Sequence, residues 1–147
     1  LFPNLDVAGP PTFWSPSLDF RAATDWVAGA PVWGPTNRLA LELAGNELDN
    51  GLDDNGNGLV DESDLVLTLD LGGPAEQRLV IGKNITEYLA AELPDGGDTN
   101  GNGLEDERGL CFSLEGGVLL VRMSVGFVGS DDELLVRTYS TSIRLRN

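Results

Sequence analysis

Carboxylate and amide side chains alternate in a twelve-residue segment of this sequence, residues 53–64. A calcium loop of that length takes oxygen ligands from positions one, three, five, seven, nine and twelve, with glycine at position six. Gly58 falls at position six, and alternate side chains of so tight a loop converge on one point. We therefore predict a cation site here. Its predicted ligands are Asp53, Asn55, Asn57, the carbonyl of Leu59, Asp61 and Asp64, with Glu62 as an alternative closing carboxylate.

A second segment, residues 98–107, repeats the same order of residues 45 positions later. Position twelve of this copy is Gly109, so Glu107 must close the second site. The sequence predicts two bound Ca²⁺ ions, and the first site is expected to be the tighter because its ligand set is complete. The predicted ligands of the second site are Asp98, Asn100, Asn102, the carbonyl of Leu104, Asp106 and Glu107.

Ordinary turn chemistry is the competing interpretation, because Asn, Asp and Gly all tolerate left-handed backbone and their acids can simply be solvated. The occurrence of the same order of ligand residues in two segments favours metal binding over ordinary turn chemistry. Glu47, Asp49 and Asp95 lie just outside the segments, where they either add a ligand or only strengthen the negative field. Magnesium fits less well than calcium because it demands tighter octahedral geometry. No helix pair flanks either segment, so the ions are expected to support the fold rather than to switch it.

The overall charge of the chain agrees with cation binding. Twenty-four carboxylates stand against nine Lys and Arg, which gives a net charge of −15. Such a surface repels nucleic acid and anionic membrane and attracts divalent cations. Solubility alone is the other explanation of the excess, but the acids cluster in the two segments. We therefore expect no nucleic-acid partner.

Catalysis finds little support in the residue types. The chain has no histidine, which removes Ser-His-Asp and Cys-His mechanisms, and its single cysteine, Cys111, lies in an apolar pattern typical of a buried residue. A glycosidase needs two carboxylates in a cleft, yet nearly all clustered acids lie in the two segments. We predict a protein that is not an enzyme, and a hydrolase would require an acid pair elsewhere.

The predicted fold is one domain, residues 1–147, of the α+β class with β-structure dominant. Hydrophobic residues make up 41% of the chain, a globular balance, and no apolar run is long enough to span a bilayer. Residues 1–16, with four prolines, are expected to form an irregular arm before a β-rich head at residues 17–147. The chain starts at Leu1 without methionine, so we expect that an anchor or signal precedes it.

Period-2 patterns predict antiparallel strands through the head. One helix is expected at residues 84–93, because Asn84 with Glu87 resembles a capping box and apolar residues follow at helical spacing. Trp26 and Trp33 are expected to pack on the core rather than to bind sugar. The predicted strands are residues 17–22, 38–43, 65–69, 77–82 and a closing meander of 110–114, 118–128 and 134–146.

The order of motifs resembles the soluble head of a pilin-like protein, closest to the J-type minor pseudopilins of type II secretion systems, which are related to type IV pilins. The resemblance extends from about Leu18 to the last residue. The segments that carry it are LDFR (18–21), DW (25–26), PVWGP (31–35), DNGLDD (49–54), GLEDERGL (103–110) and TSIRLRN (141–147).

This resemblance implies a β-rich, periplasmic or cell-surface head that contacts other pilin-like subunits and has no catalytic residues. It also implies an upstream hydrophobic helix as the only membrane contact, and calcium as a support of the head. The alternative is a secreted calcium-dependent binding or adhesion module that uses Trp14, Trp26 or Trp33 on an exposed face. An apolar helix upstream of Leu1 favours the first, and a cleaved signal without such a helix favours the second.

Overall fold

The structure is a computed structural model that describes residues 14–144. Residues 1–13, most of the expected arm, and residues 145–147, the end of the last expected strand, lie outside the described part. The strands are β1 (Trp14–Ser15), β2 (Ser17–Phe20), β3 (Ala23–Val27), β4 (Ala30–Trp33), β5 (Asn37–Leu43), β6 (Ser63–Leu69), β7 (Gln77–Ile85), β8 (Leu110–Glu115), β9 (Val118–Val128) and β10 (Leu134–Arg144).

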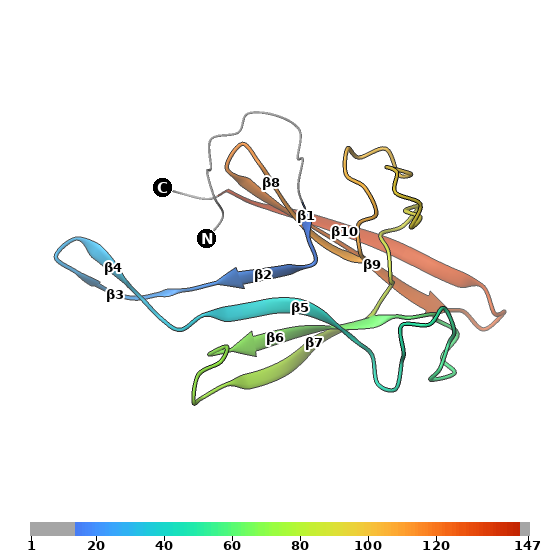
Figure 1. Cartoon of the computed structure of the whole chain (residues 1–147), viewed down its shortest axis with the longest axis horizontal. Helices are drawn as coiled ribbons and strands as arrows, with labels where there is room; N and C mark the ends of the chain where they lie inside the picture. The colour runs from blue at the N-terminus through green and yellow to red at the C-terminus, as the bar shows by residue number, and fades with distance from the viewer. Residues whose placement is uncertain (1–13, 145–147) are drawn as a thin grey trace.

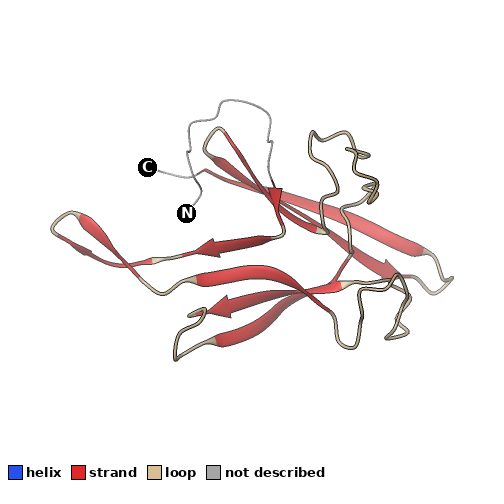
Figure 2. Ribbon diagram, viewed as in Figure 1, coloured by secondary structure: helices blue, strands red, loops and turns tan. Residues whose placement is uncertain are grey.

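The fold is all-β, which corrects the α+β class expected from the sequence. Residues 14–144 contain no helix (Figure 2). The architecture therefore also differs from the α+β head that a pilin-like protein implies. Within these residues there is accordingly no helix of the length and apolarity needed to cross a membrane.

The helix expected at residues 84–93 is wrong for a local reason. Asn84 still belongs to β7 and has a left-handed φ of 60°, and Ala91 is left-handed as well, at 66°. The amide of Leu89 donates to the carbonyl of Glu107 at 3.0 Å, so it is not free for a helical bond. Long-range backbone pairing thus overrides a pattern that looked like a helix start.

The strands form an eight-stranded antiparallel sheet in the order β1-β8-β9-β7-β6-β5-β2, with β10 paired to β9. The strand β7 meets β9 only where Ile85 pairs with Val125, so the sheet bends there into two groups. In Figure 1, β2, β5, β6 and β7 form one group and β1, β8, β9 and β10 the other. The ends of the sheet, β1 and β2, are consecutive in sequence, so the sheet nearly closes on itself.

Apolar side chains from both groups of strands fill the space between them. Leu110, Phe112 and Leu119 are buried there against leucines of β2, β5 and β6. A second cluster joins Leu89, Leu104 and Cys111. Burial raises the pKa of the Cys111 thiol to about 12, which confirms this cysteine as an inert core residue.

The strands β3 and β4 form a separate two-stranded hairpin that projects from the body (Figure 1). Trp26 is 67% exposed and Trp33 is 57% exposed on this hairpin. The expectation that both tryptophans pack on the core is therefore wrong. A two-stranded hairpin that stands away from the sheet has no core to bury them in.

Candidate metal centres

Two long loops hold the predicted ligands, and both lie at the end of the molecule opposite the β3–β4 hairpin (Figure 1). We call residues 44–62, between β5 and β6, loop one, and residues 86–109, between β7 and β8, loop two. Glu62 of loop one and Glu92 of loop two line the same cavity of about 270 Å³. The two acidic loops are thus neighbours in space.

Asp53 organises the turn of loop one through backbone amides. Its Oδ1 accepts hydrogen bonds from Gly56 N at 2.6 Å and Asn57 N at 3.1 Å, and its Oδ2 accepts one from Gly58 N at 2.7 Å. The Gly58 amide, with the other two, holds the pKa of Asp53 below its ordinary value because the N–H groups favour the ionised carboxylate. This corner of the loop therefore keeps a negative charge.

Glu62 lies behind the asparagines of loop one and is almost fully buried, with 1% of its surface exposed. Its Oε1 accepts from Asn55 Nδ2 at 2.6 Å and from Asn57 Nδ2 at 2.7 Å. Its Oε2 is buried without a hydrogen-bond partner among the described residues. A buried carboxylate oxygen without a partner costs free energy that a bound cation would recover.

A second buried glutamate, Glu47, adjoins the same asparagine. Its Oε1 accepts from Asn55 N at 2.8 Å, and its Oε2 is the other orphaned carboxylate oxygen of loop one. The side-chain oxygens of Asn55 and Asn57 each accept one backbone N–H, so each retains a lone pair for a cation. Loop one thus gathers two buried carboxylates and two amide oxygens.

Loop two repeats this construction 45 residues later. Asp98 accepts from Gly101 N, Asn102 N and Gly103 N at 2.7, 2.9 and 2.7 Å, as Asp53 does in loop one. Asn102 Nδ2 donates to Glu107 Oε1 at 2.6 Å. Glu107 is fully buried, and its Oε2 has no partner within residues 14–144. Burial raises the pKa of Glu107 above its ordinary value.

The structural repeat begins before the segments that the sequence pattern identified. The amide of Ala44 donates to the carbonyl of Glu62 at 3.0 Å, and Leu89, 45 residues later, donates to Glu107 at the same distance. Glu92 is the counterpart of Glu47 and is equally buried. It accepts, at 3.2 to 3.4 Å, from the Thr99 amide and hydroxyl and from the amides of Asn100 and Asp106.

Glu92 is the site residue that sequence reasoning missed, because the expected helix at residues 84–93 included it. The signal was present, since Glu47 stands just before the first segment and Glu92 stands 45 positions later. Extending the repeat backwards from Asp53 and Asp98 would have found it.

The structure also places the residues at position twelve of each loop and the two leucines that were predicted to offer carbonyl ligands. Asp64 lies in β6 opposite Glu42, away from the asparagines of loop one, whereas Glu62 contacts them. Gly109, at position twelve of loop two, has no room for a side chain, because a Cβ there would collide with the carbonyl oxygen of Thr86. Leu59 and Leu104 bury their side chains at matching positions beneath the two loops.

Asp61 and Asp106 turn towards the backbone that enters each loop. Asp61 accepts from Asn50 N at 3.1 Å and Gly51 N at 2.7 Å, and Asp106 accepts from Gly96 N at 3.0 Å. Both aspartates have a left-handed φ, 48° and 50°. They therefore shape the loop entrance instead of joining the asparagine–glutamate groups.

Asp61 also joins an acidic cluster that the sequence did not predict. One carboxylate oxygen each of Asp49, Asp61 and Glu87 lie within 4.8 Å of one another, a grouping that could bind a metal ion. Arg108 pairs with Glu87 at 2.7 Å and lines the same cavity of about 230 Å³. Arg108 already balances part of the cluster's charge, which sets it apart from the asparagine–glutamate groups of the loops.

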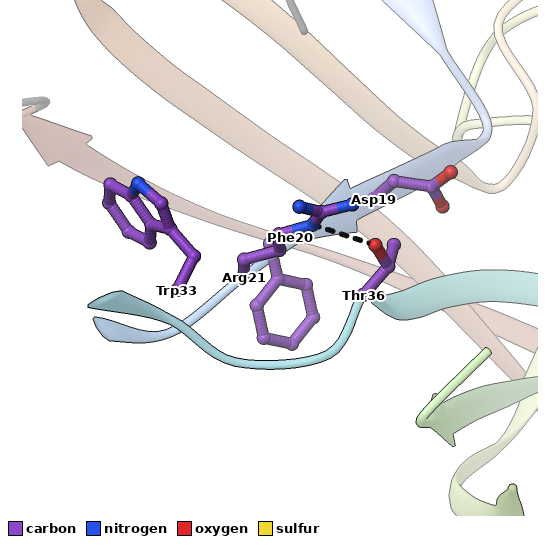
Figure 3. Close-up of a pocket in the computed structure, with 5 residues that line it drawn as sticks. All are labelled: Asp19, Phe20, Arg21, Trp33 and Thr36. Atoms are coloured by element: carbon purple, nitrogen blue, oxygen red, sulfur yellow. Dashed lines mark hydrogen bonds between the residues drawn. The ribbon is translucent and has the colours of Figure 1, made fainter. Parts of the chain in front are cut away.

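A third cavity, of about 660 Å³, lies at the root of the β3–β4 hairpin (Figure 3). Arg21 Nε donates to Thr36 Oγ1 at 2.8 Å, and the rings of Phe20 and Trp33 point to different sides. Asp19 is the one carboxylate among its described lining residues, and its bidentate bond to Arg38 lowers the pKa of Asp19. This cavity does not supply the carboxylate pair that a glycosidase needs.

Comparison of the chain with family models, curated proteins and solved structures finds no match in any of the three.

Proposed function

We propose that this protein is a non-catalytic, extracytoplasmic module in which loop one and loop two each bind one Ca²⁺ ion. The observation that carries the proposal is the orphaned, buried Oε2 of Glu62, repeated at Glu107 in the second loop. In each loop the other oxygen of the same carboxylate, Oε1, accepts from asparagine side chains, Asn55 and Asn57 at Glu62 and Asn102 at Glu107. The repetition of the arrangement argues for a ligand that both loops need.

Calcium is the ion that this chemistry favours. Each group offers only carboxylate and amide oxygens, and the chain has no histidine to suit zinc or copper. The ligands come from a tight turn and from glutamates on both sides of it, which suits the six to eight oxygens that calcium accepts. Magnesium would have to lose more of its water than such a site compensates.

The role we assign to the ions is support of the fold. Loop one holds Glu47, Asp53 and Glu62 close together with no lysine or arginine in residues 44–62. Like charges at such a density repel one another and loosen the loop when no cation is present. The ions then fix the two loops against the sheet.

Titration calorimetry and thermal melting test this proposal. We expect two calcium equivalents per chain and a melting temperature that rises by about 10 °C or more over chelated protein, from about 3 kcal/mol per site at excess calcium. Glu133→Gln, an exposed acid of the same type outside both loops, is the control and should leave both readings unchanged. Equal melting with calcium and with chelator would overturn the proposal.

Two versions of the biological role follow from different observations. The order of motifs supports an assembly subunit of a pilin-like or type II secretion system that contacts other such subunits. Exposed Trp26 and Trp33 support an adhesion module instead. Antibody labelling of filaments sheared from the native cells tests assembly. Glycan-array binding that is lost in Trp26→Ala and Trp33→Ala would favour adhesion, and absence from filaments would count against assembly.

A further inference from the structure

Among the described residues, the edge strand β10 has a strand on one side only along its whole length. All of its eleven residues pair with β9 in an unbroken antiparallel register. Within residues 14–144 no strand pairs with its other edge. Every residue of β10 is exposed, including Tyr139 at 55%. A long, exposed strand edge offers a row of unpaired amides and carbonyls to another chain.

Proteins usually protect such an edge with proline, inward-pointing charge, a bulge or a covering segment. The strand β10 contains no proline, no lysine and no acid, and its pairing with β9 has no register shift. Its one inward-facing charge is Arg137, which pairs with Val125. Its residues facing the same side as the core residues Leu119, Val121 and Met123 include large apolar ones. These are Leu135, Tyr139 and Ile143.

The charge of this region is opposite to that of the molecule. The strands β9 and β10 together contain three arginines and no Asp or Glu, although the chain as a whole carries a net charge of −15. Arg137 and Arg144 lie on β10 itself and are exposed on opposite faces of the strand. The edge is therefore apolar, and it is basic from Arg137 to Arg144, beyond the acids Asp131, Asp132 and Glu133 that precede the strand.

We propose that β10 binds an extended, acidic segment of a partner protein, which adds a strand to the open edge. Main-chain hydrogen bonds supply the affinity in this mode of recognition, and alternate side chains supply the specificity. Acidic side chains of the added strand would pair with Arg137 and Arg144. A second copy of this chain that pairs through the same edge is a poorer occupant, because it would bring another arginine-bearing β10 to the interface.

This proposal goes beyond ion binding, since the strand that it concerns lies outside loop one and loop two. The probe is a capped, fluorescein-labelled peptide of eleven residues in which pairs of valines alternate with pairs of glutamates, so that glutamates lie on both faces of the added strand. Fluorescence anisotropy with calcium-saturated protein should show binding. The matched valine–lysine peptide should bind at least about tenfold more weakly. An acidic peptide N-methylated at alternate amides should lose at least about tenfold as well, because it keeps its charge but cannot complete the strand.

Charge reversal on the protein completes the test. Arg137→Glu with Arg144→Glu should reverse the preference between the two peptides, while Lys83→Glu on β7 should leave it unchanged. Should the reversed variant melt at room temperature, Arg137→Gln with Arg144→Gln replaces it and should abolish the preference. Equal binding of the acidic and basic peptides, or full binding by the N-methylated one, contradicts the proposal. Sedimentation velocity that shows self-association dependent on Arg137 and Arg144 reassigns the edge to a second copy and also overturns it.

Discussion

Loop one and loop two share one backbone design but satisfy their buried carboxylates differently. In loop two, the Thr99 hydroxyl donates to Glu92 at 3.2 Å. In loop one, the matching residue is Asp54, which has no proton to donate to Glu47 and instead accepts from Asn50 Nδ2 at 2.8 Å. The amides of Thr99 and Asp106 also donate to the same oxygen of Glu92, and no matching bonds reach Glu47. Glu47 therefore keeps an orphaned oxygen, whereas Glu92 does not.

This difference shows how the calcium affinity of a repeated loop can change while the conformation of its turn stays the same. Loop one has two orphaned oxygens, on Glu47 and Glu62, and loop two has one, on Glu107. Each orphaned oxygen is a favourable ligand that no protein donor competes for. We therefore expect loop one to bind calcium more tightly. The sequence predicts the same ranking from the ligand set ending at Asp64, but the orphaned oxygens provide a different physical reason for it.

The two loops also connect different kinds of strand pair. Loop one joins β5 and β6, which are hydrogen-bonded neighbours. Loop two joins β7 and β8, which are not neighbours in the sheet and belong to the two groups on either side of the bend. Loss of order in loop one should thus remain local, while loss of order in loop two should spread into the strands that it connects.

The largest effect is expected from Glu62→Gln, which removes the charged ligand of the tighter site. In excess calcium the free energy of unfolding should fall by about 3 kcal/mol, and the melting temperature by about 5–10 °C. Calorimetry should show one calcium equivalent instead of two, with the tighter one lost. Loss of the weaker equivalent instead would reverse our ranking of the loops.

A somewhat smaller loss, about 2 kcal/mol, is expected from Glu107→Gln in calcium, because loop two binds more weakly. The two variants should differ in which segments become less protected from hydrogen exchange. Hydrogen exchange should speed up in β8 and at the end of β7 as well as in loop two, whereas Glu62→Gln should affect loop one alone. The same exchange pattern in both variants would show that the strand connections do not matter.

Exchanging the residues that differ, Asp54→Thr and Thr99→Asp, tests the hydrogen-bond argument. A hydroxyl at position 54 gives Glu47 a donor, so calcium affinity of loop one should fall by about fivefold, equivalent to about 1 kcal/mol. The acid at position 99 removes one of three donors to Glu92 Oε1 and leaves the amides of residues 99 and 106, so the affinity of loop two should rise by less than that factor. Calorimetry of Asp54→Thr in the Glu107→Gln background measures the affinity of loop one alone. Calorimetry of Thr99→Asp in the Glu62→Gln background measures the affinity of loop two alone. Unchanged affinities would mean that the orphaned oxygen of Glu47 is not a ligand.

Protonation gives a smaller effect that separates apo from calcium-bound protein. Burial raises the folded-state pKa of Glu107 above 4.5, so its protonated form favours folding. That contribution is complete below about pH 4.5 and disappears as the pH rises through the raised value. In metal-free buffer at neutral pH, Glu107→Gln should therefore melt higher than the unmodified protein. The difference in melting temperature between Glu107→Gln and the unmodified protein should disappear at acid pH and change sign in excess calcium.

Much of the strand framework could be predicted because period-2 patterns report which face of a strand is buried. The strand expected at residues 118–128 is β9, and residues 38–43, 65–69, 77–82 and 110–114 fall within β5 to β8. The false helix at residues 84–93 arose because Asn84, Glu87 and the apolar spacing satisfy local helix rules. Its true conformation depends on pairing with residues some twenty positions later, such as the bond between Leu89 and Glu107.

The candidate site was predictable only as far as it is local. Asp53, Asn55 and Asn57 follow one another in a single turn, so their spacing revealed them. The cluster of Asp49, Asp61 and Glu87 was hidden because Glu87 joins from a different loop, through the fold. Exposure of Trp26 and Trp33 was equally hidden, since it depends on a hairpin standing clear of the sheet.

The smallest expected effect comes from Asp64→Asn, and it decides between the sequence template and the structural arrangement. The template assigns Asp64 to position twelve, but the structure places it in β6 directly across from Glu42. Glu42 is already ion-paired with Arg78, which offsets its repulsion of Asp64. Removing the charge of Asp64 should therefore leave calcium affinity unchanged and change stability by less than about 0.5 kcal/mol. An affinity loss of about tenfold or more would restore Asp64 as the closing ligand. Glu62, which already contacts both asparagines, would then be the positioning residue of loop one.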